Sequence, residues 1–95
     1  MAGYIYFVSN RKYGTLYLGV TSHLAGRIDQ HKKGEADGFT KRYSLTKLVY
    51  TEAYEKIEEA IQREKQLKNW KRDWKIALID KVNPEWKDLY AMING

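Results

Sequence analysis

Two short runs rich in aromatic and β-branched residues stand at the start of the chain, separated by a turn. Residues 3–8 are apolar on both alternating faces, which is typical of a central strand, and residues 15–20 form a second extended run. The segment between them contains Asn10 and Gly14, residue types that favour a hairpin loop. The sequence therefore predicts that the chain begins with a β-hairpin.

The rest of the chain alternates between helical and extended patterns. Thr21 or Ser22 is suited to cap a helix that stops at Gly34. Asn83 and Pro84 look like the N-cap and the first residue of a final short helix. The expected elements after the hairpin are a helix to about residue 33, a loop over 34–44, a strand over 45–54, a helix over about 55–70, a shorter helix to about 82 and the final helix.

These elements define the expected fold. We expect an α+β fold with a small three-stranded, mainly antiparallel sheet flanked by helices, in the order β-β-α-β-α-α-α. The length of 95 residues suits one modest core, so residues 1–95 are expected to form a single domain.

Composition narrows the chemistry that is available. The chain holds no cysteine and two histidines, and its formal net charge is +5. The lack of cysteine excludes disulfides, thiol catalysis and cysteine-based zinc or iron–sulfur sites, and a multi-histidine zinc site is not expected. Any metal should therefore be a hard ion held by carboxylate and water. With no long apolar run and no secretory signal, a cytoplasmic protein without membrane contact is expected.

Positive charge is concentrated in residues 63–75, which hold six basic and two acidic residues and so carry +4 of the total charge. Such a cluster attracts phosphate and steers polyanions. Basic side chains near a helix C-terminus also oppose the helix dipole and keep the surface soluble, so a purely structural role is the alternative.

Three polar residues share the apolar stripes of the predicted helices. Arg27 and His31 fall on the same face as Leu24, and Glu64 lies in the middle of the apolar side of the long helix. Burying such polar groups against a small sheet costs folding free energy unless they form hydrogen bonds or ion pairs, or bind a ligand. The structural alternatives are an ion pair of Glu64 with Lys68, a packed Arg27 stem with its head in solvent, and a satisfied His31 at the edge of the core.

The sheet that these residues face is rich in tyrosine. Tyr6 lies on one face of the first strand, and Tyr17 shares a face of the second strand with Gly19. Buried tyrosines usually pack and find a partner for their hydroxyl, whereas a tyrosine beside an arginine and a metal-bound carboxylate can become a useful base. Gly19 inside a strand indicates close approach of a ligand or of another segment.

Together these residues resemble the GIY-YIG nuclease superfamily over nearly the whole chain, as a small stand-alone member with one domain. Tyr4-Ile5-Tyr6 and Tyr17-Leu18-Gly19 stand where the two triplets of the family name belong. Arg27, Glu64 and the segment over residues 83–89 follow in the family order. A single triplet is weak evidence, but the ordered set of five features at fitting spacings is specific.

The resemblance implies metal-dependent phosphodiester hydrolysis of DNA by an endonuclease or nickase that uses one divalent ion, Mg²⁺ or Mn²⁺. It implies that Glu64 is the metal ligand, that Arg27 neutralises charge on the scissile phosphate, and that Tyr6 activates or orients the attacking water. The other implied site residues are Tyr17, which completes the site, His31, which assists Tyr6 or contacts the phosphate, and Gly19 and Asn83, which orient the site.

The chain departs from the family pattern at two positions. Tyr4 stands where the first triplet has glycine, although Gly3 precedes it. Val20 stands where some members carry a lysine directly after the second triplet. If that lysine activates the tyrosine, a substitute is needed here, and His31 is the candidate.

The expected contacts with nucleic acid are basic and aromatic. If residues 63–75 formed one continuous helix, a stripe of basic residues would lie near Glu64, and an expected junction around residues 70–73 would interrupt this stripe. The residues of the stripe are Lys65, Lys68, Arg72 and Lys75. Lys41 and Arg42, together with Phe39 and Tyr43, are suited to grip the backbone or to stack bases. Trp70 and Trp74 are expected in the core.

So small a surface can read few base edges, so low sequence specificity or recognition of DNA structure is expected. The substrate is then double-stranded, single-stranded or branched DNA, with repair or recombination as the setting. A nucleic-acid-binding module with little or no turnover is the alternative function, and an adaptor that acts with a partner chain is a third.

Overall fold

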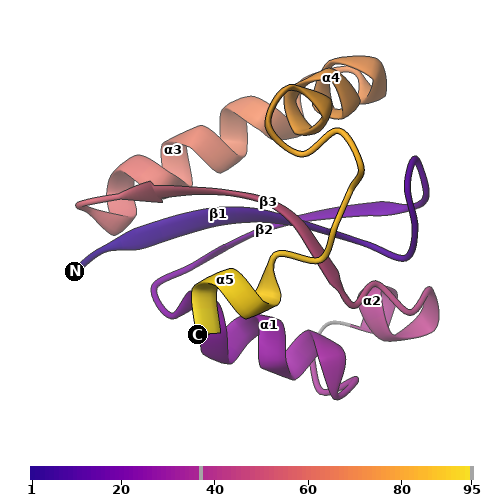
Figure 1. Cartoon of the computed structure of the whole chain (residues 1–95). Coiled ribbons are helices and arrows are strands. Elements are labelled where there is room, and N and C mark those ends of the chain that lie inside the picture. Colours follow the sequence, from indigo (N-terminus) through magenta and orange to yellow (C-terminus); the bar gives the residue numbers. More distant parts are fainter. Residues whose placement is uncertain (37, 95) are drawn as a thin grey trace.

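The computed structural model describes residues 1–36 and 38–94 of the chain. Its centre is a sheet of three strands, β1 (Gly3–Ser9), β2 (Leu16–Thr21) and β3 (Lys47–Tyr54). The strands lie in the order β2-β1-β3, and β1 is antiparallel to both neighbours (Figure 1). The predicted opening hairpin and the α+β class with a small antiparallel sheet are confirmed.

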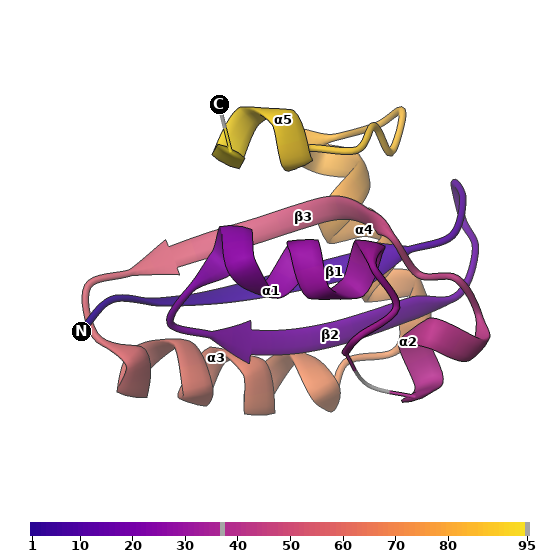
Figure 2. The same cartoon turned by 90° about the horizontal axis from the view of Figure 1, so that it is seen from below.

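Helices cover both faces of this sheet. α3 (Ile57–Lys68) and α4 (Arg72–Val82) lie on one face, and α1 (Leu24–Lys32) and α5 (Tyr90–Asn94) lie on the other (Figure 1). α2 (Gly38–Arg42) lies on the same side as α1, beyond its C-terminal end (Figure 2). Within the two described ranges, no helix is long and apolar enough to cross a lipid bilayer.

β1 is buried on both faces, as its apolar composition predicts. Ile5 and Phe7 belong to the apolar cluster beneath α3 and α4, whereas Tyr6 and Val8 belong to the cluster beneath α1 and α5. All four side chains are at most 2% exposed. Because successive side chains of a strand point to opposite faces, this alternation directs Tyr6 towards α1.

The segment predicted as a loop over residues 34–44 contains α2, so the element order is β-β-α-α-β-α-α-α, with one helix more than predicted. The predicted stop at Gly34 is present, since this glycine has a φ of +72°, a left-handed conformation that other residues resist. Thr40 is the buried residue of α2. The segment therefore has no apolar stripe from which a helix can be predicted.

The polar residues before α1 do not cap it as predicted. α1 begins at Leu24 after His23, which makes no capping hydrogen bond with its side chain. The Thr21 hydroxyl instead accepts a hydrogen bond from the His23 backbone N–H at 3.0 Å. The prediction that Thr21 or Ser22 is the N-cap is therefore wrong.

Asn83 closes α4 instead of opening the last helix, which starts at Tyr90, so the predicted cap at Asn83 is wrong. The buried Asn83 amide donates to the carbonyl oxygens of Val49 and Lys87, both at 2.9 Å, and its own oxygen accepts from the Lys87 N–H at 3.1 Å. These three bonds satisfy the side chain and join the C-terminal segment to β3.

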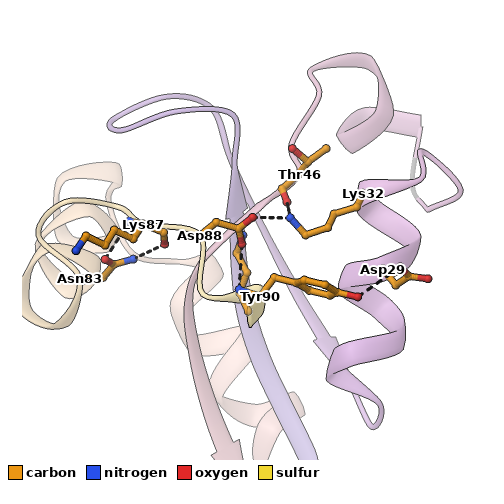
Figure 3. A network of polar contacts seen from close by, with 8 residues as sticks. Asp29, Lys32, Thr46, Asn83, Lys87, Asp88 and Tyr90 are labelled. Carbon is orange, nitrogen blue, oxygen red and sulfur yellow. Dashed lines mark hydrogen bonds and ion pairs between the residues drawn. The ribbon is translucent and has the colours of Figure 1, made fainter. Parts of the chain in front are cut away.

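Further polar contacts fasten this segment to α1 (Figure 3). The Asp88 carboxylate pairs with the Lys32 ammonium at 2.5 Å and accepts from the backbone N–H groups of Leu48 and Tyr90, at 3.2 Å and 3.1 Å. The Tyr90 hydroxyl donates to Asp29 of α1 at 3.5 Å. The non-helical segment over residues 83–89 and the first residue of α5, Tyr90, thus hold α5 against α1.

The basic stretch over residues 63–75 does not form one helix, because α3 ends at Lys68 and α4 begins at Arg72. The expected break in the basic stripe is therefore present. Trp70 and Trp74 pack edge to face with ring centroids 6.1 Å apart. Trp74 is 54% exposed, so the prediction that both tryptophans lie in the core is wrong for Trp74.

Glu52 of β3 gathers a compact polar cluster beneath α3. Arg63 donates to it through Nε at 2.9 Å and Nη2 at 3.2 Å, and the hydroxyls of Tyr50 and Tyr54 donate as well. Burial is the largest single influence and raises the pKa of Glu52. The hydrogen bonds from Arg63, Tyr50 and Tyr54 together outweigh it, so the Glu52 pKa lies below its ordinary value.

Glu52→Gln is expected to lower the free energy of unfolding by about 1–3 kcal/mol at neutral pH, because a charge-assisted acceptor is lost. A carboxylate with a lowered folded-state pKa stabilises the protein above the unfolded-state pKa of about 4.3, and this contribution disappears as the pH falls through the folded-state pKa. Urea unfolding of parent and variant should therefore differ less at about pH 3 than at neutral pH. The exposed Glu58→Gln is the matched control and should change little. A Glu52 difference that stays constant with pH would contradict this account.

Candidate active site

A buried chain of hydrogen bonds links the sheet to α1 and α2. The Tyr6 hydroxyl lies 2.9 Å from His31 Nε2, and His31 Nδ1 lies 3.1 Å from the Thr40 hydroxyl. Tyr6, His31 and Thr40 are 2%, 3% and 2% exposed. Hydrogen bonds in such a water-poor setting are electrostatically stronger than in water, and losing a partner is costly. The three side chains therefore orient one another.

The His31 imidazole can form these two hydrogen bonds in either of its two neutral tautomers. When Nε2 accepts from the Tyr6 hydroxyl, the neutral ring carries its proton on Nδ1 and donates to the Thr40 oxygen. When Nε2 donates to Tyr6, Thr40 donates to Nδ1. In the first tautomer His31 is placed to receive the phenolic proton of Tyr6, which is the chemistry of a proton acceptor for a tyrosine base.

Gly19 makes room for the Tyr6 hydroxyl. Tyr6 and Gly19 are partners in the β1–β2 register, and a Cβ added at Gly19 would lie 2.3 Å from the Tyr6 oxygen. A side chain at Gly19 would displace the Tyr6 ring from His31. The close approach that the strand glycine predicts is thus made by a side chain from the neighbouring strand.

Tyr17 lies between the buried residues of the site and the protein surface. It lies on β2, which is an edge strand, and it is half-buried. Its ring centroid is 5.8 Å from that of His31 and 6.4 Å from that of Phe39. Tyr17 therefore stands between the buried chain and solvent.

Glu64 lies on α3, which runs along the β2 side of the sheet (Figure 2). Its carboxylate pairs with the Lys68 ammonium at 2.8 Å; the Glu64 side chain is 13% exposed and that of Lys68 is 58% exposed. Glu64, first, and the Tyr17 phenol both raise the pKa of Lys68. The Glu64–Lys68 pair is therefore within electrostatic range of Tyr17. The structural alternative of an ion pair at i and i+4 is present.

The donor set at Glu64 fits a hard, partly hydrated ion. No cluster of three or more carboxylate or imidazole groups able to cage a metal exists among residues 1–36 and 38–94. Mg²⁺ takes one or two protein carboxylates and keeps water or phosphate oxygens as its other ligands, so a single carboxylate is sufficient. The Lys68 side chain is largely exposed, so its ammonium can move into solvent when a divalent ion binds the Glu64 carboxylate.

Arg27 lies one helical turn before His31, in an open hollow of about 530 Å³ that also has Thr21 of β2 in its lining. Its guanidinium donates to the Gln30 side chain at 3.3 Å. Gln30 is exposed and neutral. Among the described residues, Arg27 forms no ion pair with a carboxylate. The lining of the hollow also includes two carboxylates, Glu35 and Asp29, and Asp29 pairs with Lys33 at 2.9 Å, so the hollow has mixed charge.

Other predicted site residues lie apart from this group. The hydrogen bonds of Asn83 run to β3 and to the C-terminal segment, so the structure gives it no contact with Tyr6, His31 or Glu64 among the residues described. Arg72 donates to the carbonyl oxygens of Tyr13 and Gly14, at 2.9 Å and 2.7 Å, and so pins the hairpin loop.

The basic residues predicted to contact nucleic acid are divided between the two sides of the sheet. Lys41 and Arg42 are exposed on α2, and Lys65 and Lys68 are exposed on α3. Lys75 lies beyond the break between α3 and α4, separated from Glu64. The stripe predicted for a continuous helix is thus reduced to its α3 members.

Thr40 is the site residue that sequence reasoning misses. It follows His31 by nine residues and belongs to no motif, and the helix that positions it was expected to be a loop. The only available signal is its place between Phe39 and Lys41, both of which are candidates for nucleic-acid contact. A contact between two side chains that depends on the fold of α2 leaves no local pattern.

Comparison with known proteins identifies the family to which this chain belongs. A family model of the GIY-YIG catalytic domain matches residues 2–77. UPF0213 proteins of Staphylococcus aureus strains Mu3 and Mu50 are each 36% identical over 66 residues, which cover 70% of this chain and 80% of the relative. The solution NMR structure of a UPF0213 protein from Bacillus halodurans has a TM-score of 0.59 and 28% identity, with 93% of both chains covered. The chain belongs to the GIY-YIG family.

Proposed function

We propose that the chain is an endonuclease or nickase that hydrolyses phosphodiester bonds in DNA and depends on a divalent ion, Mg²⁺ or Mn²⁺. The observation that carries the proposal is the buried Tyr6–His31–Thr40 chain, whose His31 ring contacts Tyr17; Tyr17 in turn acts electrostatically on Lys68, the ion-pair partner of Glu64. We propose further that residues 1–95 act as one domain in the cytoplasm, in repair or recombination.

Glu64 would hold the metal ion, which supplies charge neutralisation and polarises the phosphate when bound. Its carboxylate is mostly shielded from solvent, and its partner Lys68 is largely exposed. When Lys68 leaves the carboxylate, its ammonium stays beside the site and is available to the phosphate backbone. Glu64 and Lys68 thus have complementary roles at one edge of the sheet.

His31 would take the phenolic proton of Tyr6 as the Tyr6 oxygen takes a proton from the attacking water, so that the proton ends on the imidazole. The supporting geometry is the 2.9 Å contact between the Tyr6 hydroxyl and His31 Nε2. This contact supports His31 as the substitute for the lysine that is absent at Val20, because its imidazole already touches the Tyr6 oxygen from α1. Tyr17, whose ring centroid is 5.8 Å from that of His31 and which is half-buried, would contact the scissile phosphate from the solvent side.

Arg27 would bind a phosphate oxygen through the hollow on the α1 side. Arginine stays charged at all working pH values and matches the geometry of phosphate. Lys41, Arg42, Lys65 and Lys68 would contact the backbone, and Arg72 would keep its role in the hairpin loop. With charge rather than base edges as the main contact, low sequence specificity follows.

Glu64→Gln is expected to reduce the single-turnover cleavage rate by about 100-fold or more, because the metal ligand is lost while shape is kept. Cleavage is measured with Mg²⁺, Mn²⁺ and chelator on double-stranded, single-stranded and branched DNA, and Glu58→Gln is the matched control. Equal cleavage by Glu64→Gln and the parent would remove Glu64 from the site. A parent that binds all three DNA forms yet cleaves none would identify a binding module instead.

Thr40→Val is expected to lower kcat about tenfold with KM nearly unchanged, because one hydrogen bond of about 1–1.5 kcal/mol that orients His31 is lost. Thr40→Ser keeps the hydroxyl and should restore the rate. The measurement is steady-state cleavage, with circular dichroism as the check on folding. A serine variant as slow as the valine variant, or a loss confined to KM, would contradict a positioning role for Thr40.

A further inference from the structure

Aromatic rings lead outwards from Tyr17 onto α2. The Tyr17 and Phe39 ring centroids are 6.4 Å apart with an interplanar angle of 33°, and those of Phe39 and Tyr43 are 4.9 Å apart at 51°. Both distances lie in the range in which aromatic pairs attract each other. Phe39 and Tyr43, which we call the aromatic step, therefore form a continuous ring surface with Tyr17.

The aromatic step is exposed: Phe39 is 43% exposed and Tyr43 is 42% exposed. The buried residues Thr40 and Leu45 pack α2 and its C-terminal end against the domain. The exposed rings of Phe39 and Tyr43 are therefore not needed for this packing. The two rings contact each other and form one exposed aromatic patch, the kind of surface that a ligand with flat apolar faces can cover.

Positive charge accompanies the rings. The Arg42 guanidinium lies 5.6 Å from the centre of the Tyr43 ring, and Lys41 is exposed on the same helix. Residues 38–42 contain no acidic side chain. Aromatic faces interleaved with cations suit nucleobases joined by phosphates better than an acidic or apolar peptide, because each class of group on the surface has a partner in the strand.

We propose that the aromatic step stacks unpaired nucleobases next to the scissile phosphate, so that the substrate class is single-stranded or locally unpaired DNA. The inference rests on the proposed function. Bases in an intact duplex already stack on one another and present only their edges, so the step cannot use their faces. Lys68 lies on α3, across the sheet from α2 (Figure 1), and would meet the backbone while the bases turn towards Phe39 and Tyr43.

The test compares two single strands that have equal charge and differ in bases, with a duplex as a third ligand. The Glu64→Gln protein, with Mg²⁺, is titrated with an oligothymidylate of about 12 nucleotides, an abasic strand of the same length and a duplex, by fluorescence anisotropy. We expect the oligothymidylate to bind at least about tenfold more tightly than the abasic strand. Adding Phe39→Ala with Tyr43→Ala should remove this difference and leave the abasic affinity unchanged.

Trp74→Ala is the matched control, since it removes an exposed aromatic ring that contacts Trp70 and Lys71 instead of the site. It should leave the preference for bases intact. The pair Phe39→Leu and Tyr43→Leu keeps apolar packing without a ring face and covers the case in which the alanine pair unfolds. It should also lose the preference.

Equal affinity of the Glu64→Gln protein for the oligothymidylate and the abasic strand would overturn the inference, as would a preference that survives loss of both rings. Cleavage by the parent is measured separately. Base-dependent binding without any cleavage would overturn the proposed nuclease function and leave the aromatic step standing, whereas cleavage without base-dependent binding would overturn the aromatic step alone.

Discussion

The hydrogen bond between the Tyr6 hydroxyl and His31 Nε2 joins the central strand to α1 through two buried side chains. A buried hydroxyl or imidazole without a partner costs about 1–3 kcal/mol, so each ring holds the other in place. The rest of the site follows from this contact. Gly19 must lack a side chain beside the Tyr6 oxygen, and Thr40 must bring α2 to the other nitrogen of the imidazole.

Tyr17 stands at the exposed end of this contact, between two surfaces of different chemistry. On the α3 side, Lys68 pairs with Glu64 and offers an ammonium to phosphate. On the α2 side, Phe39 continues the ring surface outwards. A strand crossing Tyr17 would have its backbone at one surface and its bases at the other. The edge position of β2 makes both surfaces reachable from solvent.

Local patterns in the sequence predict much of this arrangement. Alternation in the first strand places Tyr6 on one face, and helical spacing places His31 on the apolar side of its helix. The same spacing gives the Glu64–Lys68 pair as a structural alternative, and the structure contains that pair with the Glu64 side chain 13% exposed. These residues are predictable because the face of a strand or helix that packs against a neighbouring element has apolar residues at a regular spacing in the sequence.

The features that sequence reasoning misses depend on contacts between distant segments. α2 is secured by Thr40 against His31, and Asn83 is used by β3 instead of by a following helix. Arg72 is engaged by the hairpin loop 58 and 59 residues away, which no local pattern reports. Trp74 is exposed because α4 starts a new direction after Lys68, so its spacing from Trp70 does not bury it.

The central claim is that Tyr6, His31 and Thr40 act as one unit in the proposed reaction. A double-mutant cycle of Tyr6→Phe and Thr40→Val in single-turnover cleavage tests it most directly, because groups that act as a unit have non-additive effects. The account predicts that Thr40→Val, which slows the parent, has almost no further effect once Tyr6→Phe is present. Full additivity of the two losses would contradict it and would leave Thr40 as a packing residue of α2.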